Sequence, residues 1–223
     1  MNPAPKLLLA SNSPRRRKLI SLGKWTFTIY PVDVDERRSE NEKPEDYVLR
    51  LAQMKAGTAA RNCGSEAVVL GADTVVVDDA DILGKPSSRA EAVSMLRRLR
   101  GRVHQVYTGI ALLNNQQGRV VSDLCITDVP MRSYTDDEID AYVSSRDPLD
   151  KAGAYAIQHT GFHPVINMQG CYASVMGLPL CHIVRTLEKI FIEADRGVAK
   201  ACQEYLNYQC PVSESILNFE RVV

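Results

Sequence analysis

The chain has 223 residues, of which 45% are hydrophobic and 24% are charged. This balance is typical of a globular protein, and it excludes a disordered chain, a fibrous repeat and a heptad rod. Lys and Arg together number 27, as do Asp and Glu, so the formal net charge is zero. Because proteins that bind nucleic-acid polymers normally carry a basic excess, we expect no such partner.

The N-terminal region has only four consecutive apolar residues, Leu7 to Ala10, before polar residues follow. Such a run is too short for a signal-peptide core or a membrane span. The six cysteines are scattered, with no CxxC pattern. In a chain of this size without an export signal, free thiols in a reducing compartment are the favoured interpretation. We therefore expect a cytoplasmic protein with no membrane partner.

The first part of the chain alternates strands and helices. Pro14 suits the first position of a helix, with Ser13 as its N-cap and Gly23 as its end. Pro44 opens a second helix, whose apolar positions follow a 3.6-residue period. Apolar runs predict strands at 7–10, 26–31 and 67–77.

The second part adds a long hairpin and further capped helices. Ser88 and Thr135 each precede a glutamate by three residues, the pattern of a capping box at a helix start. Residues 103–113 and 120–131 predict two strands joined by a five-residue turn at 114–118. A Gly-rich stretch follows at 153–177, then a helix near Pro179 and a tail from Asp195 that is helical to about residue 207 and irregular beyond. Alternating elements around a hairpin predict a mixed-sheet α/β fold.

Two arginines lie in the first turn of the predicted helix at Pro14. Arg15 and Arg16 offer planar donors that suit phosphate oxygens. Arginine at this end of a helix opposes the helix dipole, which costs stability unless an anion binds there. The alternative is a solvated basic turn, since Arg17 and Lys18 follow directly.

A lone carboxylate interrupts the most apolar predicted strand. Burying Asp73 is costly unless it is paired or bound to a cation, and the alternative is that it faces solvent. Glu36 closes the acidic run at 33–36, for which the alternative is a solvated loop. Two carboxylates meeting at one point would form a site for a hard cation such as Mg²⁺ or Mn²⁺. Lys55 and Lys85 would neutralise phosphate charge there, or else be ordinary surface lysines.

Several common site motifs are absent from the sequence. It contains neither GxxxxGK[ST] nor GxGxxG after a strand, and neither CxxC nor HExxH. His159 and His163 are four residues apart, but the residues between them do not predict a helix, so a shared metal is disfavoured.

Six short motifs occur in a characteristic order, at 10–16 (ASNSPRR), 71–76 (GADTVV), 83–86 (LGKP), 104–109 (HQVYTG), 150–158 (DKAGAYAIQ) and 175–180 (VMGLPL). Together they resemble the Maf family of nucleoside triphosphate pyrophosphatases, from about Leu7 to about Ile192. The stretch from His159 to Gln169 departs from the family pattern, which has glycine after the glutamine.

The resemblance implies a fold and an activity. The fold is an elongated mixed sheet flanked by helices, with two lobes around a central cleft. The activity is metal-dependent hydrolysis of a nucleoside triphosphate to the monophosphate and pyrophosphate, in a cytoplasmic enzyme expected to be a homodimer. The matching domain would span residues 1–194, followed by a helical tail of unknown role at 195–223.

The resemblance also implies roles for nine residues. Asp73 matches the catalytic aspartate, the proton acceptor for the attacking water, and with Glu36 it would hold the divalent cation. The positions for phosphate binding are matched by Ser13, Arg16, Lys55 and Lys85. The positions associated with substrate choice are matched by Arg15, Thr74 and Gln158.

Two of these positions resemble the family branch that acts on dTTP and UTP. Ala72-Asp73-Thr74 and Gln158 match that branch, whereas a branch acting on 7-methyl-GTP has a serine before the aspartate and a glutamine after it. Uracil and thymine present an acceptor–donor–acceptor edge that a glutamine amide can pair with, and a hydroxyl adapts to either role. We expect cleavage of dTTP and UTP and removal of modified pyrimidine nucleotides. The alternatives are a pyrophosphatase for 7-methyl-GTP or other modified nucleotides, and a non-catalytic regulator of cell division.

Overall fold

A computed structural model describes residues 6–220 of the chain, so the ends of the predicted domain (1–5) and tail (221–223) lie outside the described residues. Six strands form one sheet in the order β2-β1-β3-β5-β6, and β4 also pairs with β3. The strands are β1 (Leu7–Leu9), β2 (Phe27–Ile29), β3 (Val68–Asp78), β4 (Asp81–Leu83), β5 (Val103–Asn114) and β6 (Arg119–Pro130). β1 is parallel to β2 and β3, whereas the other pairs are antiparallel. The predicted mixed-sheet α/β fold is confirmed.

The helices are α1 (Pro14–Ile20), α2 (Pro44–Ala60), α3 (Arg89–Leu99), α4 (Asp136–Ser144), α5 (Tyr172–Val175), α6 (Leu180–Lys189), α7 (Val198–Leu206) and α8 (Ser213–Leu217). Three short 3₁₀ turns are η1 (Ser21–Gly23), η2 (Asp147–Asp150) and η3 (Ala152–Ala154). Within residues 6–220, no helix combines the length and hydrophobicity needed to cross a bilayer.

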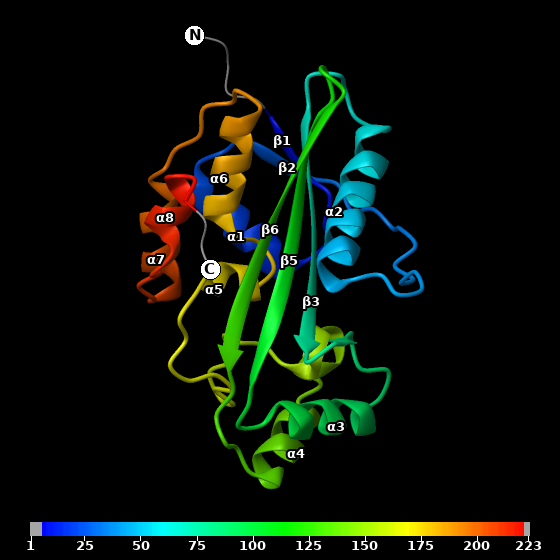
Figure 1. Cartoon of the computed structure of the whole chain (residues 1–223), viewed down its shortest axis with the longest axis vertical. Helices are drawn as coiled ribbons and strands as arrows, with labels where there is room; N and C mark the ends of the chain where they lie inside the picture. Colours follow the sequence, from blue (N-terminus) through cyan, green and yellow to red (C-terminus); the bar gives the residue numbers. More distant parts are fainter. Residues whose placement is uncertain (1–5, 221–223) are drawn as a thin grey trace.

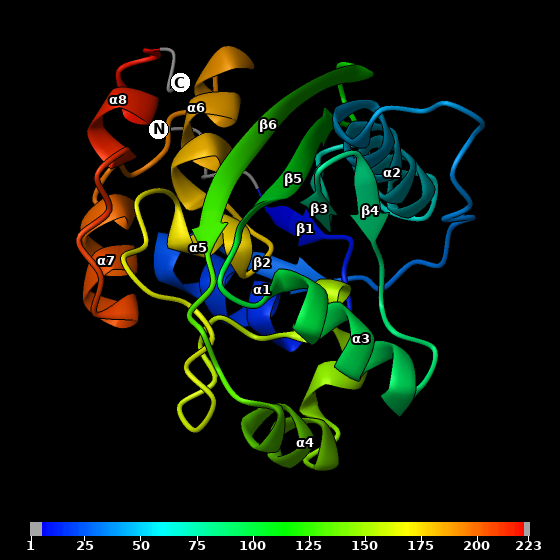
Figure 2. The ribbon, with the colours of Figure 1, turned by 60° about the horizontal axis from the view of Figure 1, so that its bottom comes forward.

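The long strands β3, β5 and β6 lie along the long axis of an elongated molecule (Figure 1). α2 lies on one side of them, and α1 with α5–α8 lies on the other, all toward one end. At the opposite end α3 and α4 pack side by side, as the turned view also shows (Figure 2). The helices therefore form two groups joined by the sheet.

Local sequence signals predicted the helix starts well. Ser13, Ser88 and Thr135 each accept a hydrogen bond from the backbone N–H three residues on, as N-caps do. The hairpin turn is shorter than predicted, four residues rather than five, because Asn114 stays in the ladder opposite Arg119.

The tail differs from the prediction beyond residue 207. The expected helix is present as α7, but α8 follows where irregular chain was predicted. Ile216 and Leu217 of α8 are buried, and α7 and α8 both pack against α6. The division into a domain at 1–194 and a tail at 195–223 stays a prediction.

One edge of β3 is shared by two short strands. β1 pairs with residues 68–70 and β4 with residues 76–78, while β5 runs along the whole of the other edge. Among the described strands none pairs with residues 71–75 on the β1 side. This gap leaves the edge of β3 without a strand partner on either side of Asp73.

Two glycines bring α2 unusually close to the sheet. A Cβ added to Gly71 would lie 2.0 Å from the Ala52 carbonyl oxygen, and one added to Gly109 would lie 2.7 Å from that of Val48. No other residue fits without moving the helix backbone. The close approach places the next turn of α2, which carries Lys55, directly over β3.

Candidate active site

A cleft of about 830 Å³ opens at the gap in β3. It is lined by residues from α1, the acidic loop before α2, α2 itself, β3 and the segment after α4. All nine predicted site residues contribute to its walls: Ser13, Arg15, Arg16, Glu36, Lys55, Asp73, Thr74, Lys85 and Gln158.

A lysine bridges the two predicted metal-binding carboxylates. Lys55 Nζ lies 2.5 Å from Asp73 Oδ1 and 2.7 Å from Glu36 Oε1. Lys55 and Asp73 are buried, with 9% and 7% of their surface exposed, so Asp73 is paired rather than facing solvent. Partial burial pushes the pKa of Glu36 upward, but Lys55, with Lys85 and Arg16 beyond it, outweighs that effect and lowers the pKa. Both carboxylates therefore converge on one point.

The acidic loop that carries Glu36 is anchored to α2. The Tyr47 hydroxyl donates to the Glu36 carbonyl oxygen at 2.7 Å. Arg50 donates to both carboxylate oxygens of Glu42, at 2.6 and 2.8 Å, and to the Arg37 carbonyl oxygen at 3.1 Å. These contacts hold Glu36 over the cleft, a role of Tyr47 and Arg50 that the sequence analysis missed.

The donor set fits a hard divalent cation. Carboxylate oxygens are the preferred ligands of Mg²⁺, which usually takes one or two of them and fills its other positions with water and substrate phosphate. Glu36 and Asp73 match that requirement. Across residues 6–220 no group of three or more His, Cys, Asp or Glu side chains is arranged so that it could hold a metal ion.

Arg16 fills the gap on β3. Its guanidinium donates to the carbonyl oxygens of Gly177 and Ala72 at 2.8 and 2.9 Å, and to Thr74 Oγ1 at 3.1 Å. The Ala72 carbonyl is the group that a neighbouring strand would have bonded, so Arg16 replaces that strand. The solvated basic turn is wrong for Arg16, and the two N–H groups left of its five can reach a ligand.

The Thr74 hydroxyl belongs to a chain of hydrogen bonds in which each hydroxyl has a fixed donor and acceptor role. Thr108 Oγ1 donates to the Ser174 carbonyl oxygen at 2.9 Å. Because a hydroxyl has a single hydrogen, Thr108 must accept in its 3.0 Å contact with Thr74. The hydrogen of Thr74 is therefore used, and Arg16 donates to one of its lone pairs. The prediction that this hydroxyl adapts to either role is wrong: Thr74 can only accept from a ligand.

The remaining predicted residues lie around the mouth of the cleft. Gln158 and Lys85 are exposed, and Arg15 is half-buried. Side chains that the sequence analysis did not assign form an apolar wall, made by Val76, Val106, Tyr155, Ile157, Val175 and Met176. All six lie inside the recognised motifs, but only the folded chain brings them together.

A buried histidine supports this wall. His104 Nε2 lies 2.8 Å from the Tyr155 hydroxyl, and its ring meets the tyrosine edge-on. Burial lowers the pKa of His104 to about 4, so the imidazole is neutral at physiological pH. The sequence signal was a histidine at the start of a predicted strand, inside the 104–109 motif.

Comparison with protein families matches residues 6–190 to the family described as Maf-like protein. A "dTTP/UTP pyrophosphatase" of Bacillus mycoides is 46% identical over 184 residues, covering 82% of this chain and 95% of the relative. A protein of the same name from Dehalococcoides mccartyi is 42% identical over 186 residues, with 83% of each chain covered.

Among solved structures, the chain is similar to the Ham1 protein of Staphylococcus aureus, with 15% identity and a TM-score of 0.44 over 91% of this chain and 98% of that one. It is also similar to a nucleoside-triphosphatase, dITP/XTP pyrophosphatase, of Mycobacterium abscessus, with 18% identity and a TM-score of 0.41 over 83% of this chain and 94% of that one.

Proposed function

The chain belongs to the Maf-like protein family, and from that premise we propose that it hydrolyses dTTP and UTP to the nucleoside monophosphate and pyrophosphate. The observation that carries the proposal is the convergence of Lys55, Glu36 and Asp73 at the gap in β3. Relatives at 42% and 46% identity carry the name dTTP/UTP pyrophosphatase, which supports the choice of substrate.

In the proposed reaction a water molecule attacks the α-phosphorus. The new bond joins the water oxygen to that phosphorus, the bond to the bridging oxygen breaks, and pyrophosphate leaves. Asp73 accepts the proton of the water, a step typically worth about 10²–10⁴-fold in rate. Lys55 donates a hydrogen bond to Asp73 Oδ1 at 2.5 Å and so orients the carboxylate.

The cationic side chains of the cleft would bind the triphosphate. Arg15 and Lys85 extend into its mouth, and Arg16 has two N–H groups left, while Ser13 caps the same turn. A divalent cation held by Glu36 and Asp73 would neutralise negative charge on the phosphates. We propose Mg²⁺ or Mn²⁺, since both favour carboxylate oxygen.

Base choice would depend on Thr74 and Gln158. Because Thr74 can only accept, it matches the N3–H donor of uracil and thymine and mismatches the N3 acceptor of cytosine. The Gln158 amide can pair with a carbonyl of the base. A polar group left unpaired by the wrong base costs orders of magnitude in rate, which supports dTTP and UTP over CTP.

The test is a substrate panel on the purified protein with Mg²⁺. We expect dTTP, UTP and 5-methyl-UTP to give the monophosphate and pyrophosphate, identified by chromatography, and CTP, ATP and GTP to react poorly. Release of inorganic phosphate instead of pyrophosphate would contradict attack at the α-phosphorus. A higher kcat/KM for 7-methyl-GTP than for dTTP would contradict the base assignment.

We also propose that the enzyme is a cytoplasmic homodimer. The six cysteines are free thiols, which agrees with a reducing compartment. Sedimentation of the purified protein tests the dimer, and fractionation of cells tests the location.

A further inference from the structure

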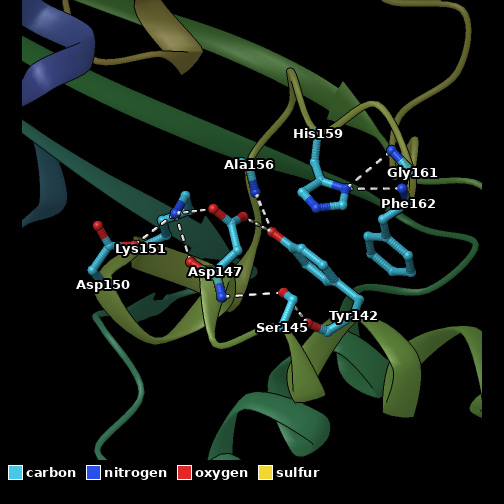
Figure 3. Close-up of polar contacts among 9 residues, drawn as sticks. All are labelled: Tyr142, Ser145, Asp147, Asp150, Lys151, Ala156, His159, Gly161 and Phe162. Atoms are coloured by element: carbon cyan, nitrogen blue, oxygen red, sulfur yellow. Dashed lines mark hydrogen bonds and ion pairs between the residues drawn. The ribbon is translucent and has the colours of Figure 1, made fainter.

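The turn that carries Gln158 is held in place by hydrogen bonds to both backbone polar groups of Ala156, its carbonyl oxygen and its N–H. The His159 N–H donates to the Ala156 carbonyl oxygen at 3.1 Å, which closes a tight turn with Ile157 and Gln158 at its centre. The Ala156 N–H donates outward to the Tyr142 hydroxyl at 3.0 Å (Figure 3). The backbone entering the Gln158 turn is therefore anchored to α4.

The anchoring hydroxyl has one orientation. Tyr142 is 3% exposed, and its O–H donates to Asp147 Oδ2 at 2.8 Å. Lys151 Nζ fixes that carboxylate by a 2.9 Å contact with the other oxygen, Oδ1 (Figure 3). Burial, followed by Asp147, raises the pKa of Tyr142, so the phenol keeps its proton. With its hydrogen committed to Asp147, a lone pair is directed at Ala156.

Two aromatic rings pack against the Tyr142 ring. Phe162 stacks on it with ring centres 4.3 Å apart and planes 16° apart, and His159 lies tilted at 4.6 Å and 60°. His159 Nδ1 accepts hydrogen bonds from the N–H groups of Gly161 and Phe162, at 3.3 and 2.9 Å. His159 is thus a structural link between the Gln158 turn and the Tyr142 ring.

We propose that Tyr142, with His159 as its partner, is a positioning residue that determines how accurately Gln158 reads the base. Tyr142 is not among the residues that line the cleft, so it acts through Ala156 rather than on the nucleotide. The inference rests on the proposed function, in which the Gln158 amide pairs with the pyrimidine. Because a hydrogen bond weakens steeply with misalignment, a turn released from α4 would lose discrimination between bases before it lost phosphate chemistry.

The first test is Tyr142→Phe, which removes only the hydroxyl and keeps the ring stack. We expect the ratio of kcat/KM for UTP to kcat/KM for CTP to fall about tenfold, the size of one well-placed hydrogen bond, with kcat for UTP changed less. The matched control is Tyr134→Phe. Tyr134 is 2% exposed, donates to the Leu96 carbonyl oxygen at 2.7 Å and packs on the same Phe162, so its loss costs stability but should leave the ratio unchanged.

The second test is a double-variant cycle with Gln158→Ala. If Tyr142 acts through Gln158, then Tyr142→Phe has no further effect on the ratio once the amide is gone. Two results would overturn the proposal in favour of a general packing role. One is that Tyr142→Phe changes the ratio equally in the wild-type and the Gln158→Ala background. The other is that Tyr134→Phe changes the ratio as much as Tyr142→Phe does.

The cycle separates this inference from the proposed function. If Gln158→Ala collapses the ratio and Tyr142→Phe leaves it intact, the positioning role is wrong and the base assignment stands. If Gln158→Ala leaves the ratio intact, the base assignment fails and the positioning role fails with it. Should Tyr142→Phe not fold, His159→Ala removes the second support of the same turn, the imidazole ring, from a half-buried site. It must then lower the ratio about tenfold, or the proposal is wrong.

Discussion

The Lys55 ammonium lies between the carboxylates of Asp73 and Glu36, at 2.5 and 2.7 Å. Removing one partner of a buried ion pair leaves an uncompensated charge and costs about 3–5 kcal/mol. Lys55 therefore holds together two carboxylates that would otherwise repel each other. The pairing depends on the close approach of α2 at Gly71, since a bulkier residue there would lift Lys55 away from β3.

We expect Asp73→Asn to lower kcat for UTP by about 10²–10⁴-fold or more, because it removes the general base and a cation ligand together. The protein should stay folded, since Lys55 keeps Glu36 as its partner. Steady-state kinetics and a thermal melt measure the two effects. Asp33→Asn, on an exposed carboxylate of the acidic loop, is the control. Activity above about a tenth of wild type would refute the role of Asp73.

Removal of divalent cations should abolish activity, and added Mg²⁺ or Mn²⁺ should restore it. Glu36→Gln should raise the metal concentration that gives half-maximal activity by at least about tenfold, because an amide is a weaker ligand than a carboxylate. Titration of metal against initial rate measures this. Glu40→Gln, an exposed neighbour in the same loop that does not line the cleft, should behave as wild type. Full activity in excess EDTA would show that no metal is required.

Arg16→Lys should lower both stability and activity. A lysine cannot span the three acceptors that Arg16 bonds on β3 and at Gly177, so at least one buried acceptor loses its partner. We expect the free energy of unfolding to fall by about 1.5–3 kcal/mol in urea denaturation. Arg89→Lys, at an exposed arginine that does not line the cleft, should change neither quantity. Unaltered stability of Arg16→Lys would contradict a strand-replacing role.

The parts of the fold that local chemistry decides were predictable from the sequence. Ser88 and Thr135 cap their helices because a side-chain oxygen and the N–H three residues on meet at a helix start wherever the helix packs. α8 was not predictable, because five residues are too few to form a helix alone. It forms because Ile216 and Leu217 are buried in the core beside α6.

The candidate active site could be predicted from the sequence only to the same extent. Asp73 was found because a carboxylate in an apolar strand is costly without a partner, and that argument needs no coordinates. The role of Arg16 depends on β1 and β4 sharing one edge of β3, which leaves the Ala72 carbonyl without a strand. The polarity of Thr74 depends on Ser174, which lies 100 residues away in the sequence and reaches it through Thr108. Such facts belong to the topology rather than to any local pattern.

Acidification should lower the stability of the folded protein through the titration of His104. Its pKa is lowered by burial from 6.5 to about 4 in the folded protein. Between these values the unfolded chain binds more protons than the native one, so the free energy of unfolding decreases as pH falls. From pH 7.5 to 5 we expect a loss of about 2 kcal/mol from this group.

Urea denaturation of wild type and His104→Gln at these two pH values tests the effect. Glutamine can still pair with the Tyr155 hydroxyl but does not titrate, so the variant should lose less stability on acidification. His163→Gln, at an exposed histidine, should lose as much as wild type. Equal losses in wild type and His104→Gln would contradict the buried, neutral imidazole.

Thr108→Val should relax base selection without touching the substrate. Thr108 is fully buried, and its hydroxyl forces that of Thr74 to donate inward. With valine there, the Thr74 hydrogen can rotate toward the cleft and pair with the N3 acceptor of cytosine. We expect the ratio of kcat/KM for UTP to that for CTP to fall by about tenfold, mainly through faster CTP cleavage. Thr127→Val, which removes a buried hydroxyl of β6 outside the cleft, is the control and should keep the ratio. A ratio equal to wild type in Thr108→Val would mean that the polarity of Thr74 does not select the base.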